Sequence, residues 1–262
     1  MSRTVNTDNP TQADIKQLLN DVHGEGVDST RSLNQLHTIA ENHPELIDTK
    51  VIAEHIQSSN RARVRKRLYG IAHVLVRANP DSAPALFGVI QDDLTYPDID
   101  DGISQDELQT MRGYIFNILY SATSAGIEVP PRVLEELYAG VVEYPVMTSA
   151  ERTVDILGSL IANDSDVADQ VTEILIELSA IPEDDEVSRR FRKYATAGLA
   201  GLLDEDELPD SADIDQIERS LERNRSLLED SQQSDRSSDS SSRGLIDRLL
   251  GVGRNEGDRR DD

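Results

Sequence analysis

Hydrophobic residues recur at helical spacing along almost the whole chain between positions 11 and 205. They fall at i, i+4, i+7, i+8 and i+11, or at close variants of this series, which places them on one face of a 3.6-residue helix. No alternating pattern long enough for a strand occurs. The sequence therefore predicts an all-α protein, and the clearest stripes are Val167, Val171, Ile174, Leu175 and Leu178; Val64, Leu68, Ile71, Ala72 and Leu75; and Leu108, Met111, Ile115, Ile118 and Ala122.

Prolines and capping residues divide this pattern into helix pairs, in which a shorter helix precedes a longer one. Most of the shorter helices start 33 to 36 residues apart, and one interval is lengthened by an insertion at 95–104. Two-helix units at this period are typical of solenoids, in which each pair buries its hydrophobic faces by stacking on its neighbours. The predicted pairs are 11–22 with 27–42, 44–58 with 60–78, 80–94 with 105–125, 130–144 with 148–163, and 164–180 with 184–203.

The longer helices share a pattern in which Arg is followed by small and apolar residues at helical spacing. It is clearest in VRKRLYGIAHVL (64–75), MRGYIFNILYSA (111–122) and SRRFRKYATAGLAGLL (188–203). In this respect the chain resembles the HEAT-repeat, armadillo-like family. The resemblance implies a right-handed α-solenoid of about five helix pairs, whose longer helices line a concave surface. It implies a shape and no activity.

The remaining segments complete the predicted domain organisation. We expect a flexible N-terminus at 1–10, a solenoid domain at 11–230 and a capping helix at 211–230 within that domain. A Ser-rich stretch follows, and its composition is typical of a disordered linker. The segments after the domain are the linker at 231–242, a short amphipathic helix at 243–253 and a charged tail at 254–262.

The charge balance points to an unusual solution environment. The chain has 50 Asp plus Glu against 26 Lys plus Arg, for a formal net charge of −24, and only four of its cations are Lys. This composition resembles that of haloarchaeal cytoplasmic proteins, whose dense carboxylates keep the surface hydrated. There is no Cys, no apolar segment typical of a signal peptide in the first 25 residues and no apolar run of about 18 residues. We therefore expect a halophilic, soluble, cytoplasmic protein.

Five basic residues nonetheless crowd into the seven positions 61–67. Other Arg residues stand near the start of the other longer helices, and the family resemblance implies that such residues line the concave face. One hypothesis is that this row binds an acidic protein partner, because the Arg fork makes bidentate contacts that persist in salt. The alternative is that the cations pair with Asp and Glu of neighbouring repeats. The residues of the predicted concave basic face are Arg31, Arg61, Arg63, Arg65, Lys66, Arg67, Arg112, Arg152, Arg189, Arg190, Arg192 and Lys193.

The segment GLIDRLLGVG near the C-terminus gathers a compact apolar face after the flexible linker. Such a tethered motif is typical of a docking peptide that lies in a groove of another protein. It could equally fold back on the last repeat, or contact a membrane weakly, since it contains an Arg and no Phe or Trp. The predicted docking residues are Leu245, Ile246, Leu249, Leu250 and Val252.

The sequence gives little support for nucleic-acid binding, metal binding or catalysis. The chain has no Trp, and its aromatics do not interleave with the basic residues as a nucleic-acid stacking platform requires. The acidic insertion fails as a calcium loop, because Ile99 and Leu108 fall where an EF-hand needs carboxylates. The five His residues form no metal-binding spacing. We therefore expect no metal, no cofactor, no nucleic-acid partner and no enzymatic activity.

Together these observations predict a non-catalytic protein–protein interaction scaffold or adaptor. Its Arg-bearing face would bind one protein and its C-terminal motif another. The alternative is a peripheral membrane- or polymer-associated adaptor that the C-terminal amphipathic segment positions.

Overall fold

The structure, a computed structural model, describes residues 5–24, 26–95, 104–143, 149–163, 166–182 and 185–228. Every regular element in these ranges is a helix, so the all-α prediction is confirmed. The chain divides into two compact units, residues 1–156 and residues 157–262, which we describe separately and call unit 1 and unit 2. The Ser-rich linker, the amphipathic motif and the charged tail lie outside the described residues, as does most of the 95–104 insertion.

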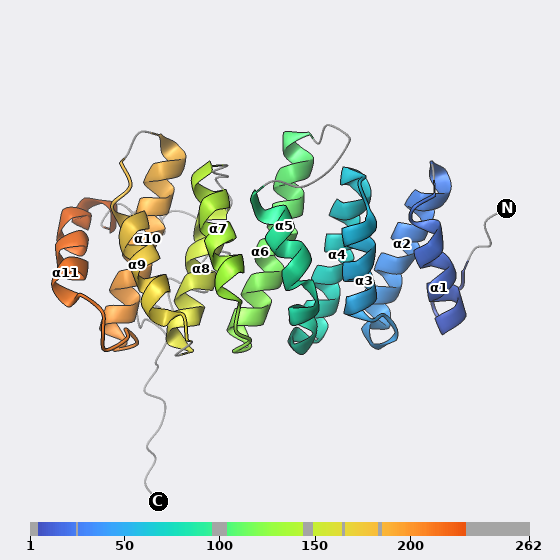
Figure 1. Cartoon of the computed structure of the whole chain (residues 1–262), viewed down its shortest axis with the longest axis horizontal. Helices are drawn as coiled ribbons and strands as arrows, with labels where there is room; N and C mark the ends of the chain where they lie inside the picture. Colours follow the sequence, from blue (N-terminus) through green and yellow to red (C-terminus); the bar gives the residue numbers. More distant parts are fainter. Residues whose placement is uncertain are drawn as a thin grey trace, which may run out of the picture. The chain divides into compact units, whose positions relative to one another are not determined.

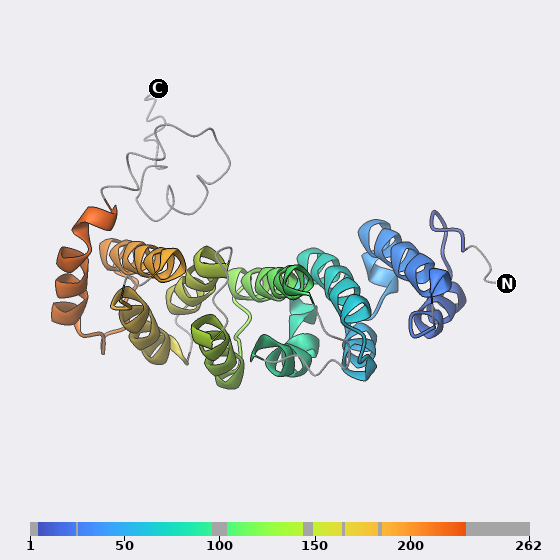
Figure 2. The same cartoon turned by 90° about the horizontal axis from the view of Figure 1, so that it is seen from above.

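Unit 1 consists of helix pairs arranged in two layers (Figures 1 and 2). Helices α2, α4 and α6 pack side by side in one layer, and α3, α5 and α7 in the other; α1, α3 and α5 pack against α2, α4 and α6, respectively. The elements are α1 (Gln12–Asp21), α2 (Val27–Asn42), η1 (Pro44–Leu46), α3 (Thr49–Ser58), α4 (Ala62–Ala78), η2 (Pro80–Leu86), α5 (Phe87–Thr95), α6 (Gln105–Ser124), α7 (Pro131–Glu143) and α8 (Ser149–Ala162), which runs across the boundary between the units.

Side-chain caps mark the starts of three of these helices, α1, α3 and α6. Thr11 caps α1 in a reciprocal capping box with Asp14, and Ser104 accepts a hydrogen bond from the backbone N–H of Glu107 at the start of α6. Asp48 accepts from the backbone N–H of Lys50, so the predicted helix 44–58 is divided into η1 and α3.

The predicted helix at 80–94 also begins differently. Pro84 lies inside it and has no N–H to donate, so the first turns are a 3₁₀ helix and the α-helix starts only at Phe87. Part of the segment 1–10, which was expected to be flexible, contacts α2. Val5 is buried, and its carbonyl accepts a hydrogen bond from the Gln35 side chain at 3.0 Å.

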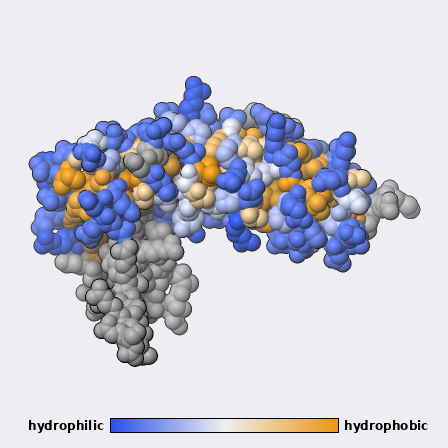
Figure 3. All heavy atoms as spheres, turned by 90° about the horizontal axis from the view of Figure 1, so that it is seen from below, coloured by the Kyte–Doolittle hydropathy of each residue, from blue (hydrophilic) through white to orange (hydrophobic). Residues whose placement is uncertain are grey.

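Aliphatic side chains form the core of unit 1, as the composition requires. Residues such as Ile39, Ile56, Leu68 and Ile71 are fully buried between the layers. Each such side chain stabilises the fold by roughly 1.5–3 kcal/mol relative to exposure. Figure 3 shows one face of the molecule, where blue hydrophilic residues dominate and orange hydrophobic residues lie among them.

Unit 2 contains the end of α8 and three helices that pack against one another, α9 (Ala168–Ser179), α10 (Glu186–Asp204) and α11 (Ile214–Arg223). The predicted capping helix at 211–230 is interrupted: α11 ends at Arg223, Asn224 forms a turn, and residues 225–228 are helical again. The Asn224 side chain is fully buried and joins all three helices. Its amide nitrogen lies 2.9 Å from the Ser179 carbonyl and 2.9 Å from the Thr196 hydroxyl, and its oxygen accepts from Arg192 Nε at 2.7 Å.

Candidate functional site

The cationic cluster at 61–67 opens helix α4, where Arg61 is the N-cap and no side chain caps the helix. Cations at a helix N-terminus are mildly unfavourable, because the macrodipole is positive there. The structure shows how this cost is met: the basic side chains leave α4 in different directions, and their acceptors lie on α2, α3, α5, α6 and the loop between α1 and α2. The cluster therefore combines separate structural and surface roles.

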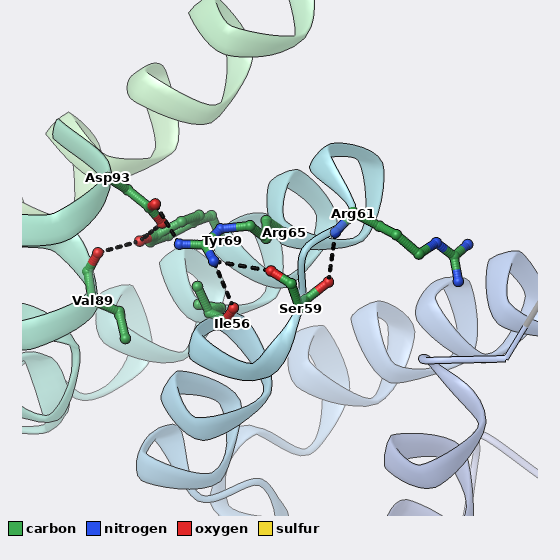
Figure 4. A network of polar contacts seen from close by, with 7 residues as sticks. All are labelled: Ile56, Ser59, Arg61, Arg65, Tyr69, Val89 and Asp93. Atoms are coloured by element: carbon green, nitrogen blue, oxygen red, sulfur yellow. Dashed lines mark hydrogen bonds and ion pairs between the residues drawn. The ribbon is translucent and has the colours of Figure 1, made fainter. Parts of the chain in front are cut away.

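Arg65 points into the core and joins α3, α4 and α5 (Figure 4). Its side chain is only 6% exposed and forms an ion pair with Asp93, whose side chain is fully buried. Its guanidinium also donates to the carbonyls of Ile56 at 3.1 Å and Ser59 at 2.9 Å, at the C-terminal end of α3. The hypothesis that Arg65 contacts a partner is therefore corrected, because this side chain is enclosed by its own fold.

Tyr69, one turn further along α4, completes this buried network. Its hydroxyl donates to Asp93 Oδ2 at 2.7 Å and lies 3.1 Å from the Val89 carbonyl. Burial raises the pKa of Asp93, while the Arg65 guanidinium acts in the opposite direction. Burial also raises the pKa of Tyr69, and the neighbouring Asp93 carboxyl adds to the shift. We call Arg65, Asp93 and Tyr69 the charged hub.

Arg61 points away from the charged hub, toward the loop between α1 and α2 (Figure 4). Its guanidinium donates to the carbonyl of Gly24 at 2.6 Å. Beside it, His23 and His55 share a hydrogen bond of 2.8 Å with their rings stacked, which links this loop to α3. Burial lowers the pKa of both imidazoles; Arg61 lowers the His23 pKa further, and His23 that of His55. Arg61 thus fastens one helix pair to the next.

The remaining cations of the cluster reach the outer surface of the α2–α4–α6 layer. Arg63, Lys66 and Arg67 line a hollow of about 580 Å³. A second hollow of about 580 Å³ lies next to it, shares Arg63 and Asn34 with it, and is also lined by Arg31 of α2. We call these two hollows the cationic groove.

Three polar contacts orient the cations of the groove. Lys66 Nζ lies 3.3 Å from Glu107 Oε1, and Arg63 Nε lies 3.7 Å from the same oxygen. Arg67 instead donates to the neutral amide oxygen of Asn34, a contact that leaves its charge uncompensated. Ion pairs between neighbouring helix pairs, which the alternative interpretation predicted, are therefore present, but among the described residues they do not include Arg67.

Gly70 and Tyr114 also line the first hollow. A Cβ at position 70 would lie 3.3 Å from the Tyr114 ring, so the absence of a side chain lets this ring lie close to α4. His73 lies beside Tyr114, with 6.1 Å between ring centroids. Burial lowers its pKa, and the nearby cations Arg77 and Arg152, together with His37, lower it further. The groove itself is lined by Tyr114 and His37 on this side, so it joins a strongly cationic part to an aromatic and imidazole part.

The structure does not bring the other predicted cations of unit 1 to this groove. Arg112 is only 3% exposed, so it cannot contact a partner in this conformation. Arg152 lies over the Tyr120 ring, 4.5 Å from its centroid, and pairs with Asp155 at 3.3 Å. Arg112 is therefore buried, and Arg152 is engaged with Tyr120 and Asp155.

The predicted cations of unit 2 lie on α10 and contact residues of unit 2. Arg190 pairs with Glu186 at 3.3 Å, and Arg192 donates to Asn224. Lys193 lies 6.0 Å from the Tyr194 ring centroid, and Arg189 is exposed. Unit 2 therefore holds its own group of basic residues.

Sequence reasoning missed the neutral and acidic residues of the groove. On α2, Asn34 and His37 follow Arg31 at steps of three residues, and on α6 Tyr114 follows Glu107 by seven. These spacings place the side chains on one helix face. The signal was present in the sequence, but it acquires a meaning only once α2, α4 and α6 are neighbours.

Within the described ranges, no group of three or more His, Cys, Asp or Glu residues could hold a metal ion. None of the helices in this part of the chain is both long enough and apolar enough to cross a membrane. The predicted docking residues of the C-terminal motif, 245–252, lie outside the described residues.

Comparison with known proteins identifies no relative of established function. No family model and no curated protein matches the sequence. One similar solved structure is the crystal structure of an engineered protein, which is 14% identical. The match covers 82% of this chain and 97% of that chain, with a TM-score of 0.46.

Proposed function

We propose that this protein is a non-catalytic interaction scaffold of the HEAT-like solenoid type, whose cationic groove binds an acidic segment of a partner protein. The observation that carries the proposal is the gathering of Arg31, Arg63, Lys66 and Arg67 around the two hollows on the α2–α4–α6 layer. These cations belong to a chain with a formal net charge of −24, so a local excess of positive charge is unexpected.

The groove has chemistry suited to carboxylates. Arg31 and Arg63 are exposed, and Arg63 retains 76% exposure of its side chain although it pairs with Glu107. An Arg side chain can grip a carboxylate through two parallel hydrogen bonds, which combine charge with geometry. Asn34 and Thr110 add neutral hydrogen-bonding groups to the same surface. A peptide with acidic side chains would contact both the Arg side chains and these neutral groups.

The acidic surface is consistent with a high-salt cytoplasm, which we propose as the working environment. At molar salt the Debye length is roughly 3 Å, so long-range attraction between protein and partner is screened. A specific contact then depends on groups that meet directly. The two-layer stacking of helix pairs in unit 1 supports the HEAT-like part of the proposal, because that stacking exposes the longer helices α2, α4 and α6 along one layer.

The proposal is tested with a fluorescein-labelled hexaglutamate peptide as probe, measured by fluorescence anisotropy. The double variant Arg63→Glu/Arg67→Glu replaces two groove cations with carboxylates. Each lost contact costs about 1 kcal/mol, so we expect binding to weaken at least about 30-fold. Circular dichroism should show unchanged helicity, since neither side chain is part of the buried core.

The matched control is Arg132→Glu/Arg219→Glu, which makes the same charge change at two exposed arginines of α7 and α11. We expect this control to bind the probe as the wild type does, apart from a small effect of net charge that added salt removes. Equal losses in the two double variants would refute a specific groove, as would a failure of the wild-type protein to bind hexaglutamate.

A further inference from the structure

We infer that Glu107 is an internal competitor for the cationic groove: its carboxylate occupies the Lys66–Arg63 part until a ligand with several acidic groups displaces it. This inference rests on the proposed function, since it concerns the selectivity of the same site. It assigns Glu107 a role in setting which acidic ligands bind.

The position of the Glu107 carboxylate is the first support. One oxygen, Oε1, lies 3.3 Å from Lys66 Nζ and 3.7 Å from Arg63 Nε. Both cations line the hollow next to α6. A carboxylate of this chain therefore already makes the contacts that a ligand carboxylate would make.

The second support is that Glu107 can leave these cations at little cost. Its other oxygen, Oε2, accepts a hydrogen bond from the Ser104 hydroxyl at 3.2 Å. Glu107 also lies in the first turn of α6, where the positive end of the helix dipole stabilises a carboxylate. Its side chain is 24% exposed, so water can replace the contact with Lys66. Displacement therefore exchanges one set of partners for another without burying a charge.

The competition favours ligands that carry several acidic groups. A tethered carboxylate has an effective concentration on the order of millimolar at the site it occupies. A ligand with one carboxylate must compete with that concentration through a single contact. A segment with several carboxylates also reaches Arg67 in the same hollow and Arg31 in the adjoining hollow, and these additional contacts offset the displacement of Glu107. The groove should therefore discriminate against isolated acidic groups.

The experiment measures binding of two labelled probes, hexaglutamate and diglutamate, to the full chain and to Glu107→Gln. Gln retains the size of Glu and its ability to occupy the third position of a capped helix, so α6 should remain intact. We expect Glu107→Gln to bind hexaglutamate about 5- to 10-fold more tightly, which corresponds to the roughly 1 kcal/mol of a surface ion pair. The affinity for diglutamate should rise by a larger factor, so the ratio of the hexaglutamate affinity to the diglutamate affinity should fall.

Two controls separate competition from a change in net charge. Glu45→Gln removes the same charge from a Glu that pairs with His43 and lines a different hollow, so it should leave both affinities unchanged. In the double variant Lys66→Gln/Glu107→Gln, the gain from removing Glu107 should largely disappear, because the cation that it freed is gone.

The outcomes distinguish this inference from the proposed function. If hexaglutamate binds the wild-type protein and Arg63→Glu/Arg67→Glu abolishes binding, but Glu107→Gln has wild-type affinity for both probes, the groove stands and internal competition is refuted. An equal gain in Glu45→Gln would refute it as well. If the wild-type protein does not bind hexaglutamate, the proposed function itself fails, and the inference fails with it.

Discussion

Three helices of unit 1 meet at a buried ion pair, whereas three helices of unit 2 meet at a buried amide. In unit 1, Arg65 and Asp93 join α3, α4 and α5. In unit 2, Asn224 joins α9, α10 and α11 through neutral groups and one Arg. Both centres satisfy backbone carbonyls at the end of a helix, which otherwise lack partners. The two units thus meet the same requirement with different chemistry.

The difference lies in what happens when one partner is removed. Desolvating a guanidinium and a carboxylate costs several kcal/mol per ion, and their mutual attraction recovers this only while both are present. A buried amide costs less to desolvate, and its hydrogen bonds each contribute about 1 kcal/mol. We therefore expect unit 1 to be strongly sensitive to the loss of a single partner, and unit 2 to be moderately sensitive.

The largest effect is expected for Asp93→Ala in the charged hub. The substitution leaves the buried Arg65 guanidinium without its counterion, and it should lower the free energy of unfolding by about 3–5 kcal/mol. Urea unfolding followed by circular dichroism at constant salt measures this loss. The neighbouring Asp92 is exposed, so Asp92→Ala is the matched control and should change stability by less than about 0.5 kcal/mol.

A second variant separates the effect of the unpaired charge from the effect of the lost side-chain volume. Replacing both partners, as in Arg65→Leu/Asp93→Leu, removes the unpaired charge and should recover part of the stability lost in Asp93→Ala. If Asp93→Ala costs no more than Asp92→Ala, the ion pair is not the element that holds α3, α4 and α5 together.

A smaller effect is expected for Asn224→Ala in unit 2. The Ser179 carbonyl, the Thr196 hydroxyl and Arg192 each lose a partner, and we expect a loss of about 2 kcal/mol. Hydrogen exchange should show faster exchange of the backbone amides of α9, α10 and α11. Gln216→Ala, at an exposed position of α11, is the control. A loss as large as that of Asp93→Ala would contradict the distinction between the two centres.

The smallest effect concerns Asp155, a second buried carboxylate of unit 1. Its side chain is 5% exposed and pairs with the partly exposed Arg152, and burial raises its pKa to about 6. Because the folded state holds this proton more tightly than the unfolded chain, this residue's contribution to stability falls as the pH rises from about 4 to about 6. Asp155→Asn should therefore be more stable than the wild type above pH 6, by about 1 kcal/mol after loss of the Arg152 pair.

Urea unfolding of both proteins between pH 4 and pH 7.5 measures this difference. The gain from Asp155→Asn should be greatest above pH 6 and smallest near pH 4, where the wild-type carboxyl is protonated. A difference that does not change with pH would show that Asp155 does not titrate in this range. The different effects expected for Asp93 and Asp155 would then need a cause other than the position of the Arg that pairs with each carboxylate.

Helical periodicity was sufficient to predict most of the helices. The stripe Val64, Leu68, Ile71 and Leu75 is the buried face of α4, and the boundaries of α2 were predicted to the residue. The starts of α3 and α5 were misplaced because local features override periodicity there. Asp48 caps α3 after a break, and Pro84 delays the α-helix until Phe87.

The candidate site was predicted less completely. The sequence identified the basic cluster, but it could not separate Arg65, which is buried, from Arg63 and Arg67, which are not. That distinction depends on where Asp93 lies, and Asp93 is 28 residues further along the chain. The part played by Glu107 likewise depends on packing between α4 and α6. Contacts between distant segments leave no periodic pattern in the sequence.

The approach of the Tyr114 ring to Gly70 has a consequence for how such proteins diverge. At 3.3 Å from a hypothetical Cβ, the ring leaves too little room for even a methyl group without shifting. Exchanging either residue alone should alter the width of the groove, whereas a larger residue at 70 could be accommodated beside a smaller one at 114. The two positions should therefore vary together during evolution, and their joint identity would mark descendants of this surface even where overall similarity has faded.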